Sequence, residues 1–295
     1  MYDLNSIYIA KTIDDAIGAM IAAPDATLIC GGTDILVGLR DGVKVGGDFI
    51  SIKDIEELKG IYIDKDKNIH IKPGTTFNEI LSSDIIKQHV PCLLSAVIDI
   101  GGSQIRNIGT IGGNICNGFT TADAPPMLLG LNAIACITGK GTYRQKPVEY
   151  FYVKPEVMDL QTGELLTDII IKHEDYSGYV GHYIKFSLRD AMDIAIIGCS
   201  VVCKTDGDVL QDIRISFAAA GPLPMRARSA EKQLIGVKIN VELFETMGKL
   251  CLPDVSVITD KRVSKEFREH LVEVLPGRAC KQALSKSNDK VVDAR

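Results

Sequence analysis

Residues Thr110-Ile111-Gly112-Gly113-Asn114 place two adjacent glycines between two side chains that can form hydrogen bonds. They close a glycine-rich segment that begins at Gly101. Glycine has no Cβ, so its backbone reaches positive φ and lets a ligand approach its amide closely. Successive backbone N–H groups in such a turn form a concavity that binds anions. We therefore expect residues 110–114 to form a loop that contacts the phosphates of a ligand.

A second glycine pair, Gly31-Gly32, follows the apolar stretch 27–30, which we expect to be a strand. The pair does not belong to a Walker A loop, because no Gly-Lys-Ser/Thr follows it. The chain also lacks the G-x-G-x-x-G fingerprint of a Rossmann fold. A single glycine pair after a strand is most often a plain turn. Two such segments within a hundred residues favour a dinucleotide that is held without a Rossmann fold.

Composition and charge limit the class of protein. The chain has 295 residues, which suffices for two domains with separate cores. Its net charge of −5 and its lack of Lys/Arg blocks argue against a nucleic-acid-binding protein. The first residues carry no signal-peptide pattern, and no apolar run reaches the length of a membrane span. We therefore expect a cytoplasmic protein.

Eight cysteines are spread along the chain, and none forms a C-x-x-C pair. Without a secretion signal, we expect them to be reduced thiols. Cys199 and Cys203 lie in an apolar stretch that is typical of a buried strand. An iron–sulfur cluster needs four thiolates at cluster spacing, and the sequence lacks that pattern. Any iron–sulfur chemistry would therefore belong to another polypeptide.

The apolar pattern predicts short strands and helices in the first half of the chain. Thr12 and Thr76 each precede a helical pattern and are expected to be N-caps. Further helices are expected at residues 35–39, 85–89 and 93–100, and strands at 7–9, 27–30, 48–52, 58–63, 68–73, 133–138 and 165–172. The polar cluster 174–178 is expected to be a domain boundary.

The second half has a different order of elements. Strands are expected first, at residues 183–186, 194–204 and 209–220. Helices are expected next, at residues 230–234, 241–252 and 264–274. Strands followed by helices predict an antiparallel sheet with helices on one face, which is an α+β arrangement.

The sequence contains no convincing set of catalytic residues. The five histidines are scattered, and none has a partner at metal-ligand spacing. Asp123 precedes two prolines, so it either caps the next helix or bonds a ribitol or ribose hydroxyl. Lys185 is either an exposed strand lysine or a cation near a cofactor. An enzyme without an evident acid, base or nucleophile relies on a cofactor that carries the chemistry.

Several motifs of this chain resemble one protein family. Residues 27–34 and 105–114 resemble the two FAD loops of the flavoprotein (medium) subunits of molybdenum hydroxylases, such as xanthine, CO and aromatic-substrate dehydrogenases. Residues 115–118 and 183–195 resemble the bacterial xanthine dehydrogenase members most. The resemblance continues over nearly the whole chain, in residues 117–131, 221–231 and 264–268.

This resemblance implies an α+β fold with two domains. The first would be an FAD-binding domain of the vanillyl-alcohol oxidase or PCMH type, at residues 1–176. Its two lobes would span about residues 1–57 and 58–176. The second, at residues 178–288, would be a smaller α+β domain like the C-terminal domain of CO dehydrogenase flavoprotein.

The resemblance also implies an FAD site. The first loop would wrap the FAD diphosphate, with Thr27, Leu28, Ile29, Cys30, Gly31, Gly32, Thr33 and Asp34. The second segment would contact FAD from the other side, with Gly109, Thr110, Ile111, Gly112, Gly113 and Asn114. Single contacts are implied for Asp123, Leu165, Ile184 and Lys185, and for Ile100, where some members carry an aromatic residue. No catalytic residue and no metal ligand is implied in this chain.

The function that the resemblance implies is electron relay. A molybdenum cofactor on a large subunit would hydroxylate the substrate, xanthine in the first instance. Two [2Fe–2S] clusters on a small subunit would pass electrons to the FAD of this chain, which would reduce NAD⁺.

Three alternatives stay open at this stage. The complex could be a related aldehyde, CO or N-heteroaromatic dehydrogenase. The chain could also be a stand-alone FAD reductase of the UDP-N-acetylenolpyruvoylglucosamine reductase type, although no acid for that reaction is evident. In a different class, it could be a non-catalytic FAD-binding assembly module.

Overall fold

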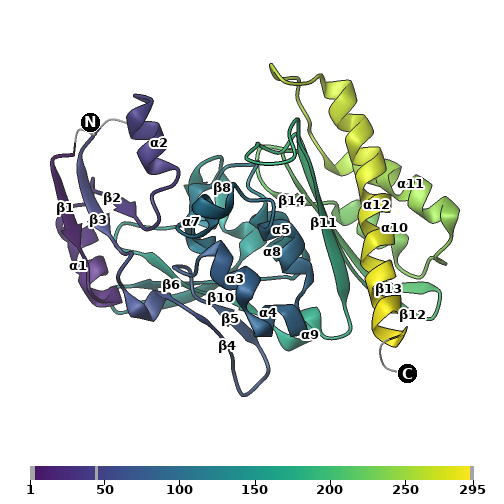
Figure 1. Cartoon of the computed structure of the whole chain (residues 1–295), viewed down its shortest axis with the longest axis horizontal. Coiled ribbons are helices and arrows are strands. Elements are labelled where there is room, and N and C mark those ends of the chain that lie inside the picture. Colours follow the sequence, from purple (N-terminus) through teal and green to yellow (C-terminus); the bar gives the residue numbers. More distant parts are fainter. Residues whose placement is uncertain (1–3, 44–45, 293–295) are drawn as a thin grey trace.

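The computed structural model describes residues 4–43 and 46–292 and contains three main β-sheets that follow one another along its long axis (Figure 1). Helices and strands are mixed throughout, so the predicted α+β class is confirmed. The expected first lobe starts at residue 1, which lies outside the described residues. None of the described helices has the length and apolarity that crossing a bilayer requires.

The first sheet is parallel, with the strand order β1-β3-β2. Its strands are β1 (Ser6–Ile9), β2 (Thr27–Ile29) and β3 (Asp48–Ser51), and its helices are α1 (Ile13–Ala22) and α2 (Ile35–Arg40). Thr12 caps α1, because its side chain accepts a hydrogen bond from the Asp15 amide. All five elements occur where the sequence predicts them.

The second sheet is antiparallel and has the strand order β4-β5-β10-β6-β7. Its strands are β4 (Ile61–Ile63), β5 (Ile69–Ile71), β6 (Ile134–Gly139), β7 (Thr142–Pro147) and β10 (Leu165–Ile171). Strand β7 was not predicted, because it is an edge strand whose residues are polar and largely exposed. The small hairpin of β8 (Tyr152–Lys154) and β9 (Val157–Met158) was not predicted either.

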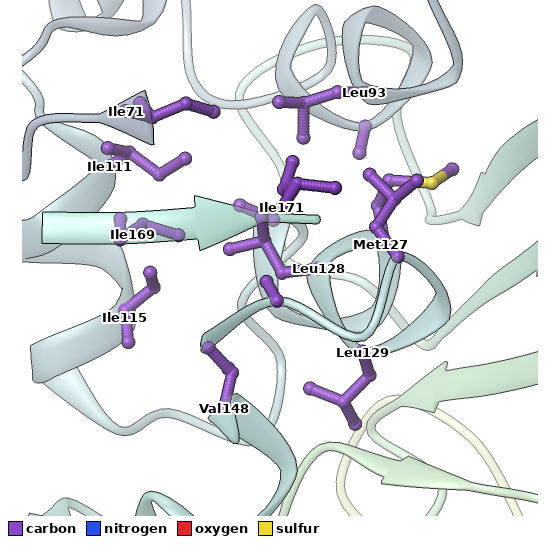
Figure 2. Packing of buried hydrophobic residues seen from close by; sticks show 14 of the residues in the cluster. Ile71, Leu93, Ile111, Ile115, Met127, Leu128, Leu129, Val148, Ile169 and Ile171 are labelled. Atoms are coloured by element: carbon purple, nitrogen blue, oxygen red, sulfur yellow. The ribbon is translucent and has the colours of Figure 1, made fainter. Parts of the chain in front are cut away.

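Short helices cover one face of the second sheet. They are α3 (Phe77–Ser82), α4 (Asp84–His89), α5 (Cys92–Val97), α7 (Ile111–Asn117) and α8 (Ala124–Gly130), and the short helix α6 (Ser103–Arg106) lies against α3. Thr76 and Glu79 form a capping box at the start of α3, which confirms the predicted cap. Figure 2 shows Ile169 and Ile171 of β10 packed among apolar side chains of α5, α7 and α8. This packing fixes α7 and α8 against the sheet.

The third sheet is antiparallel, as predicted, with the order β11-β12-β13-β14. Its strands are β11 (Val180–Phe186), β12 (Ile197–Asp206), β13 (Val209–Ala218) and β14 (Met225–Arg226). Helices α10 (Arg228–Leu234), α11 (Val241–Cys251) and α12 (Lys265–Val292) cover one face, on the right in Figure 1. Helices α5 and α8 cover the other face, so this sheet lies between the two sets of helices. Cys199 and Cys203 of β12 are fully buried free thiols.

Helix α12 is longer than predicted. The expected end at residue 274 is wrong, because the helix continues through Pro276. The apolar side chains of Leu275, Ala279 and Ala283 extend its buried stripe against the third sheet. Tertiary packing therefore outweighs the local signal of the proline. The predicted boundary 174–178 contains the short helix α9 (His173–Tyr176).

A buried polar network joins the second and third sheets. Arg214 of β13 forms an ion pair with Asp175 at 3.2 Å, and the Asn132 amide donates to the same carboxylate at 2.5 Å. Arg226 of β14 donates to the side-chain Oδ1 of Asn132 at 2.6 Å and forms an ion pair with Glu231 of α10 at 2.8 Å. Because these charges are buried, each depends on its partner, and the network fixes the relative position of the two sheets.

We predict that Glu231→Gln lowers the free energy of unfolding by about 3 kcal/mol, because it leaves the buried Arg226 guanidinium without its counter-charge. The matched control is Glu245→Gln, at an exposed position of α11, where we expect a change within about 0.5 kcal/mol. Urea unfolding of the three proteins measures both values. Equal stability of both variants would contradict a structural role for the network.

Candidate functional site

The two glycine segments meet in the structure. A Cβ added at Gly31 would overlap the carbonyl oxygen of Ile108 and lie 2.8 Å from its carbonyl carbon. It would also lie 3.3 Å from the Cα of Gly109. Only glycine therefore allows the backbone after β2 to lie against the backbone that precedes α7. The structure thus brings together two segments that are far apart in the sequence.

The first segment leads from a strand into a helix. Thr27, Leu28 and Ile29 form β2, and Gly32 has a φ of +71°, which turns the chain toward α2. Thr33 and Asp34 complete the turn before α2 begins.

Cys30 links the two segments through its side chain. Burial raises the pKa of its thiol, and a hydrogen bond with the Thr110 hydroxyl opposes that shift. A thiol with a raised pKa stays protonated at neutral pH, so Cys30 is a packing and hydrogen-bonding group here.

The second segment differs from its prediction. Residues 111–114 form the first turn of α7, not a loop, and the Thr110 side chain caps this helix. Internal acceptors take its amides: Ile111 donates to Thr75 at 3.0 Å, Gly112 to Pro73 at 2.8 Å, and Gly113 to the Thr110 hydroxyl at 3.1 Å. The expectation of consecutive free amides at residues 111–113 is therefore wrong.

The structural reason for a glycine at position 112 also differs from the expected one. Its φ is not positive, and a Cβ at this position would overlap the Pro73 ring and lie 2.6 Å from the Pro73 carbonyl oxygen. The residue is a glycine because α7 lies directly on the chain that leads into α3. Its role is the close packing of two backbones.

Asn114 carries a polar side-chain atom that the described part of the protein leaves unpaired. Its side-chain Oδ1 is buried and has no hydrogen-bond partner within the described residues. An unpaired buried acceptor costs free energy, and a ligand hydroxyl or amino group would satisfy it. Gly113, the residue before it, is exposed.

Asp123 and Lys185 form a buried ion pair at 2.9 Å, with 9% and 7% of their side chains exposed. The Tyr183 hydroxyl donates to the other oxygen of Asp123 at 2.7 Å. Lys185 also donates to the Asp99 carbonyl oxygen at 3.0 Å. Burial raises the pKa of Asp123, while the charge of Lys185 and the Tyr183 hydrogen bond oppose that rise.

These contacts decide between the alternatives for Asp123 and Lys185. Asp123 precedes α8 but makes no side-chain cap hydrogen bond, so the capping hypothesis is wrong. Lys185 is not an exposed strand lysine, because its ammonium lies against Asp123. The pair also joins two parts of the chain, since Asp123 precedes α8 and Lys185 belongs to β11.

The remaining predicted residues lie around this pair or in the cores. Ile100 is nearly buried, and its carbonyl accepts a hydrogen bond from Arg106 at 3.1 Å. Ile184 packs against the core of the third sheet, so its side chain lies on the other face of β11 from Lys185. Leu165 is buried in the core of the first sheet, with Ala10 and Ile50. The side chains of Ile184 and Leu165 therefore serve packing.

Tyr183, Asp99 and Arg106 also belong to this site and were not predicted from the sequence. A signal for Tyr183 was present, because residues two apart on a strand share a face and Lys185 lies two residues later. Asp99 and Arg106 contribute through backbone contacts at residues 99–101, which no side-chain pattern indicates. Within the described part of the chain, no three His, Cys, Asp or Glu side chains are placed to hold one metal ion.

Comparison with protein families agrees with this architecture. The family described as "FAD binding domain in molybdopterin dehydrogenase" matches residues 2–172. The family described as "CO dehydrogenase flavoprotein C-terminal domain" matches residues 182–283. The chain therefore belongs to the family of FAD-binding subunits of molybdenum hydroxylases.

Individual relatives cover the whole chain. The xanthine dehydrogenase FAD-binding subunit of Escherichia coli O157:H7 is 32% identical over 291 residues, which are 99% of this chain and 100% of that protein. The glyceraldehyde dehydrogenase medium chain of Sulfolobus acidocaldarius is 30% identical over 284 residues, 96% of this chain and 99% of that one. A solved structure of carbon monoxide dehydrogenase from Hydrogenophaga pseudoflava superposes with a TM-score of 0.91 at 25% identity, over 97% of this chain and 99% of that one.

We predict that Gly31→Ala separates the two glycine segments and lowers the free energy of unfolding by about 2 kcal/mol, because a backbone carbonyl occupies the position of the new Cβ. Gly18→Ala is the control, since no atom lies within 4 Å of the added Cβ in helix α1. We expect it to stabilise the protein by about 0.5–1 kcal/mol. Urea unfolding distinguishes the two, and a neutral Gly31→Ala would contradict the contact.

Proposed function

We propose that this chain is the FAD-carrying electron-transfer subunit of a xanthine dehydrogenase. It takes electrons from [2Fe–2S] clusters on a small partner subunit and passes them to NAD⁺, while a large partner subunit with a molybdenum cofactor hydroxylates the substrate. FAD binding is inferred from the buried Asp123–Lys185 pair, together with the contact between the two glycine segments. The choice of xanthine rests on 32% identity over the full length of a bacterial xanthine dehydrogenase FAD-binding subunit.

Three features of the described residues support the binding of a dinucleotide. The contact between Gly31 and Ile108 brings the first glycine segment against the backbone that leads into α7. The unpaired Oδ1 of Asn114 offers an acceptor for a ligand donor. Asp123 retains free lone pairs, because a carboxylate accepts about four hydrogen bonds and the protein supplies two.

In this proposal, bound FAD supplies the redox chemistry, accepting electrons and transferring a hydride. The chain's own residues bind and orient it. The first segment, with Gly31 and Gly32, would lie along the diphosphate, and Asp123 would accept from a ribitol or ribose hydroxyl. Lys185 would keep the Asp123 carboxylate ionised. We retain residues 1–176 and 178–288 as the proposed domain boundaries. The free thiols fit a reducing compartment such as the cytoplasm.

We predict that the purified chain binds FAD in a one-to-one ratio and that Asp123→Asn weakens this binding at least about tenfold, because the variant loses a charged acceptor and leaves Lys185 unpaired. Asp168→Asn is the matched control. Asp168 is equally buried and paired with Lys72 at 3.0 Å, on the second sheet. Flavin fluorescence titration measures both affinities. A wild-type chain that binds no FAD would refute the proposed function.

Two further experiments identify the electron acceptor and the substrate. We predict that NADH, added without oxygen, removes the visible absorbance of the FAD-loaded chain, because hydride transfer to NAD⁺ is reversible. Co-expression with the neighbouring large and small subunits should give a complex that oxidises xanthine faster than glyceraldehyde, nicotinate or CO. An FAD-loaded chain that NADH leaves oxidised would exclude NAD⁺ as the acceptor, and a preference for another substrate would exclude xanthine.

A further inference from the structure

Tyr183 is one of the largest fully buried side chains of the protein, and its hydroxyl is within the candidate site. It lies on β11, two residues before Lys185, and donates to Asp123 at 2.7 Å. Its amide donates to the Ser95 hydroxyl of α5 at 3.0 Å, so the residue is held at both ends. Tyr183 thus reaches from the third sheet into the part of the chain that carries the glycine segments.

Gly198 makes room for this tyrosine. The residue lies on β12, opposite Lys185, and a Cβ there would overlap the Tyr183 hydroxyl oxygen. The same Cβ would lie 2.9 Å from the ring carbon that bears the hydroxyl. The φ of Gly198 is not positive, so its backbone conformation does not require a glycine. A glycine is needed here because a side chain would take the space of the Tyr183 phenol.

The charges around Asp123 explain what the phenol does. Burial and the nearby carboxylate of Asp99 raise the pKa of Asp123, while Lys185 and the Tyr183 hydroxyl lower it. Burial also raises the pKa of Asp99, while the charges of Lys185 and Arg106 oppose that rise. Burial and Asp123 raise the pKa of Tyr183 far above its usual value, so its hydroxyl stays protonated and acts as a hydrogen-bond donor near neutral pH.

We propose that Tyr183 is a positioning residue for the cofactor: its hydroxyl orients the Asp123 carboxylate and holds it ionised, as an acceptor for a sugar or sugar-alcohol hydroxyl. This inference rests on the proposed function. Two donors from one strand, Tyr183 and Lys185, each take one oxygen of Asp123. The carboxylate therefore has one orientation, in which its remaining lone pairs point to the ligand.

The test is the FAD affinity of Tyr183→Phe as a function of pH, measured on the whole chain by flavin fluorescence. We expect about tenfold weaker binding near neutral pH. We also expect the loss of affinity on the acid side to begin about one pH unit higher than in the wild type, because Asp123 loses a donor that favours its charged form. The matched control is Tyr179→Phe, which removes another phenol-to-carboxylate hydrogen bond, to Asp212 at 2.7 Å, away from the site.

A second variant separates positioning from packing. Gly198→Ala leaves every hydrogen-bonding group in place but displaces the phenol, so it should shift the pH profile in the same direction. In the Tyr183→Phe background the same change should have little further effect on FAD affinity, because the displaced hydroxyl is already absent. Circular dichroism confirms that each variant is folded.

The outcomes are distinct. The inference is supported if FAD affinity is lost at a higher pH in Tyr183→Phe and Gly198→Ala than in the wild type, while the pH profile of Tyr179→Phe is unchanged. Wild-type affinity in Tyr183→Phe, or equally weakened binding at every pH without a shift, overturns it while FAD binding by the wild type leaves the proposed function intact. A wild-type chain that binds no FAD overturns both.

Discussion

The buried ion pair between Asp123 and Lys185 is the interaction on which the site depends. Two charges removed from water are costly unless each meets its counter-charge and further hydrogen-bond donors. Here the carboxylate precedes α8, and the ammonium and the Tyr183 phenol come from β11. The site is therefore complete only when the third sheet is docked. The network around Arg214 and Glu231 provides further buried contacts that fix this docking.

Steric fit at glycines provides the second constraint. Gly31, Gly112 and Gly198 each lie where a Cβ would overlap another part of the chain, and none of the three has a positive φ. They allow, in turn, the contact of the two glycine segments, the packing of α7 and the insertion of Tyr183. Backbone flexibility thus explains fewer of the site glycines than close packing does. Gly32, with a φ of +71°, is the site glycine that the conformational argument does explain.

Much of the fold could be predicted from the sequence, because local signals coincide with the final structure. Thr12 and Thr76 cap helices as predicted, and the strands of the third sheet follow the apolar pattern. The expectation of free amides at residues 111–113 was wrong, since the acceptors for Ile111 and Gly112 lie on a chain segment almost forty residues earlier and the Thr110 cap takes the Gly113 amide. The hydrogen bond of Tyr183 was missed because its partner Asp123 lies sixty residues away, although strand alternation already placed Tyr183 on the same face as Lys185. Long-range pairings of this kind leave no local pattern.

Hydrogen–deuterium exchange with and without FAD tests the central claim most directly, because it locates the cofactor on the chain. If the two glycine segments and β11 form one site, FAD slows exchange in residues 28–34, 108–114 and 180–186 together. Slower exchange confined to one glycine segment, with β11 unchanged at saturating FAD, would contradict a site shared between the second and third sheets.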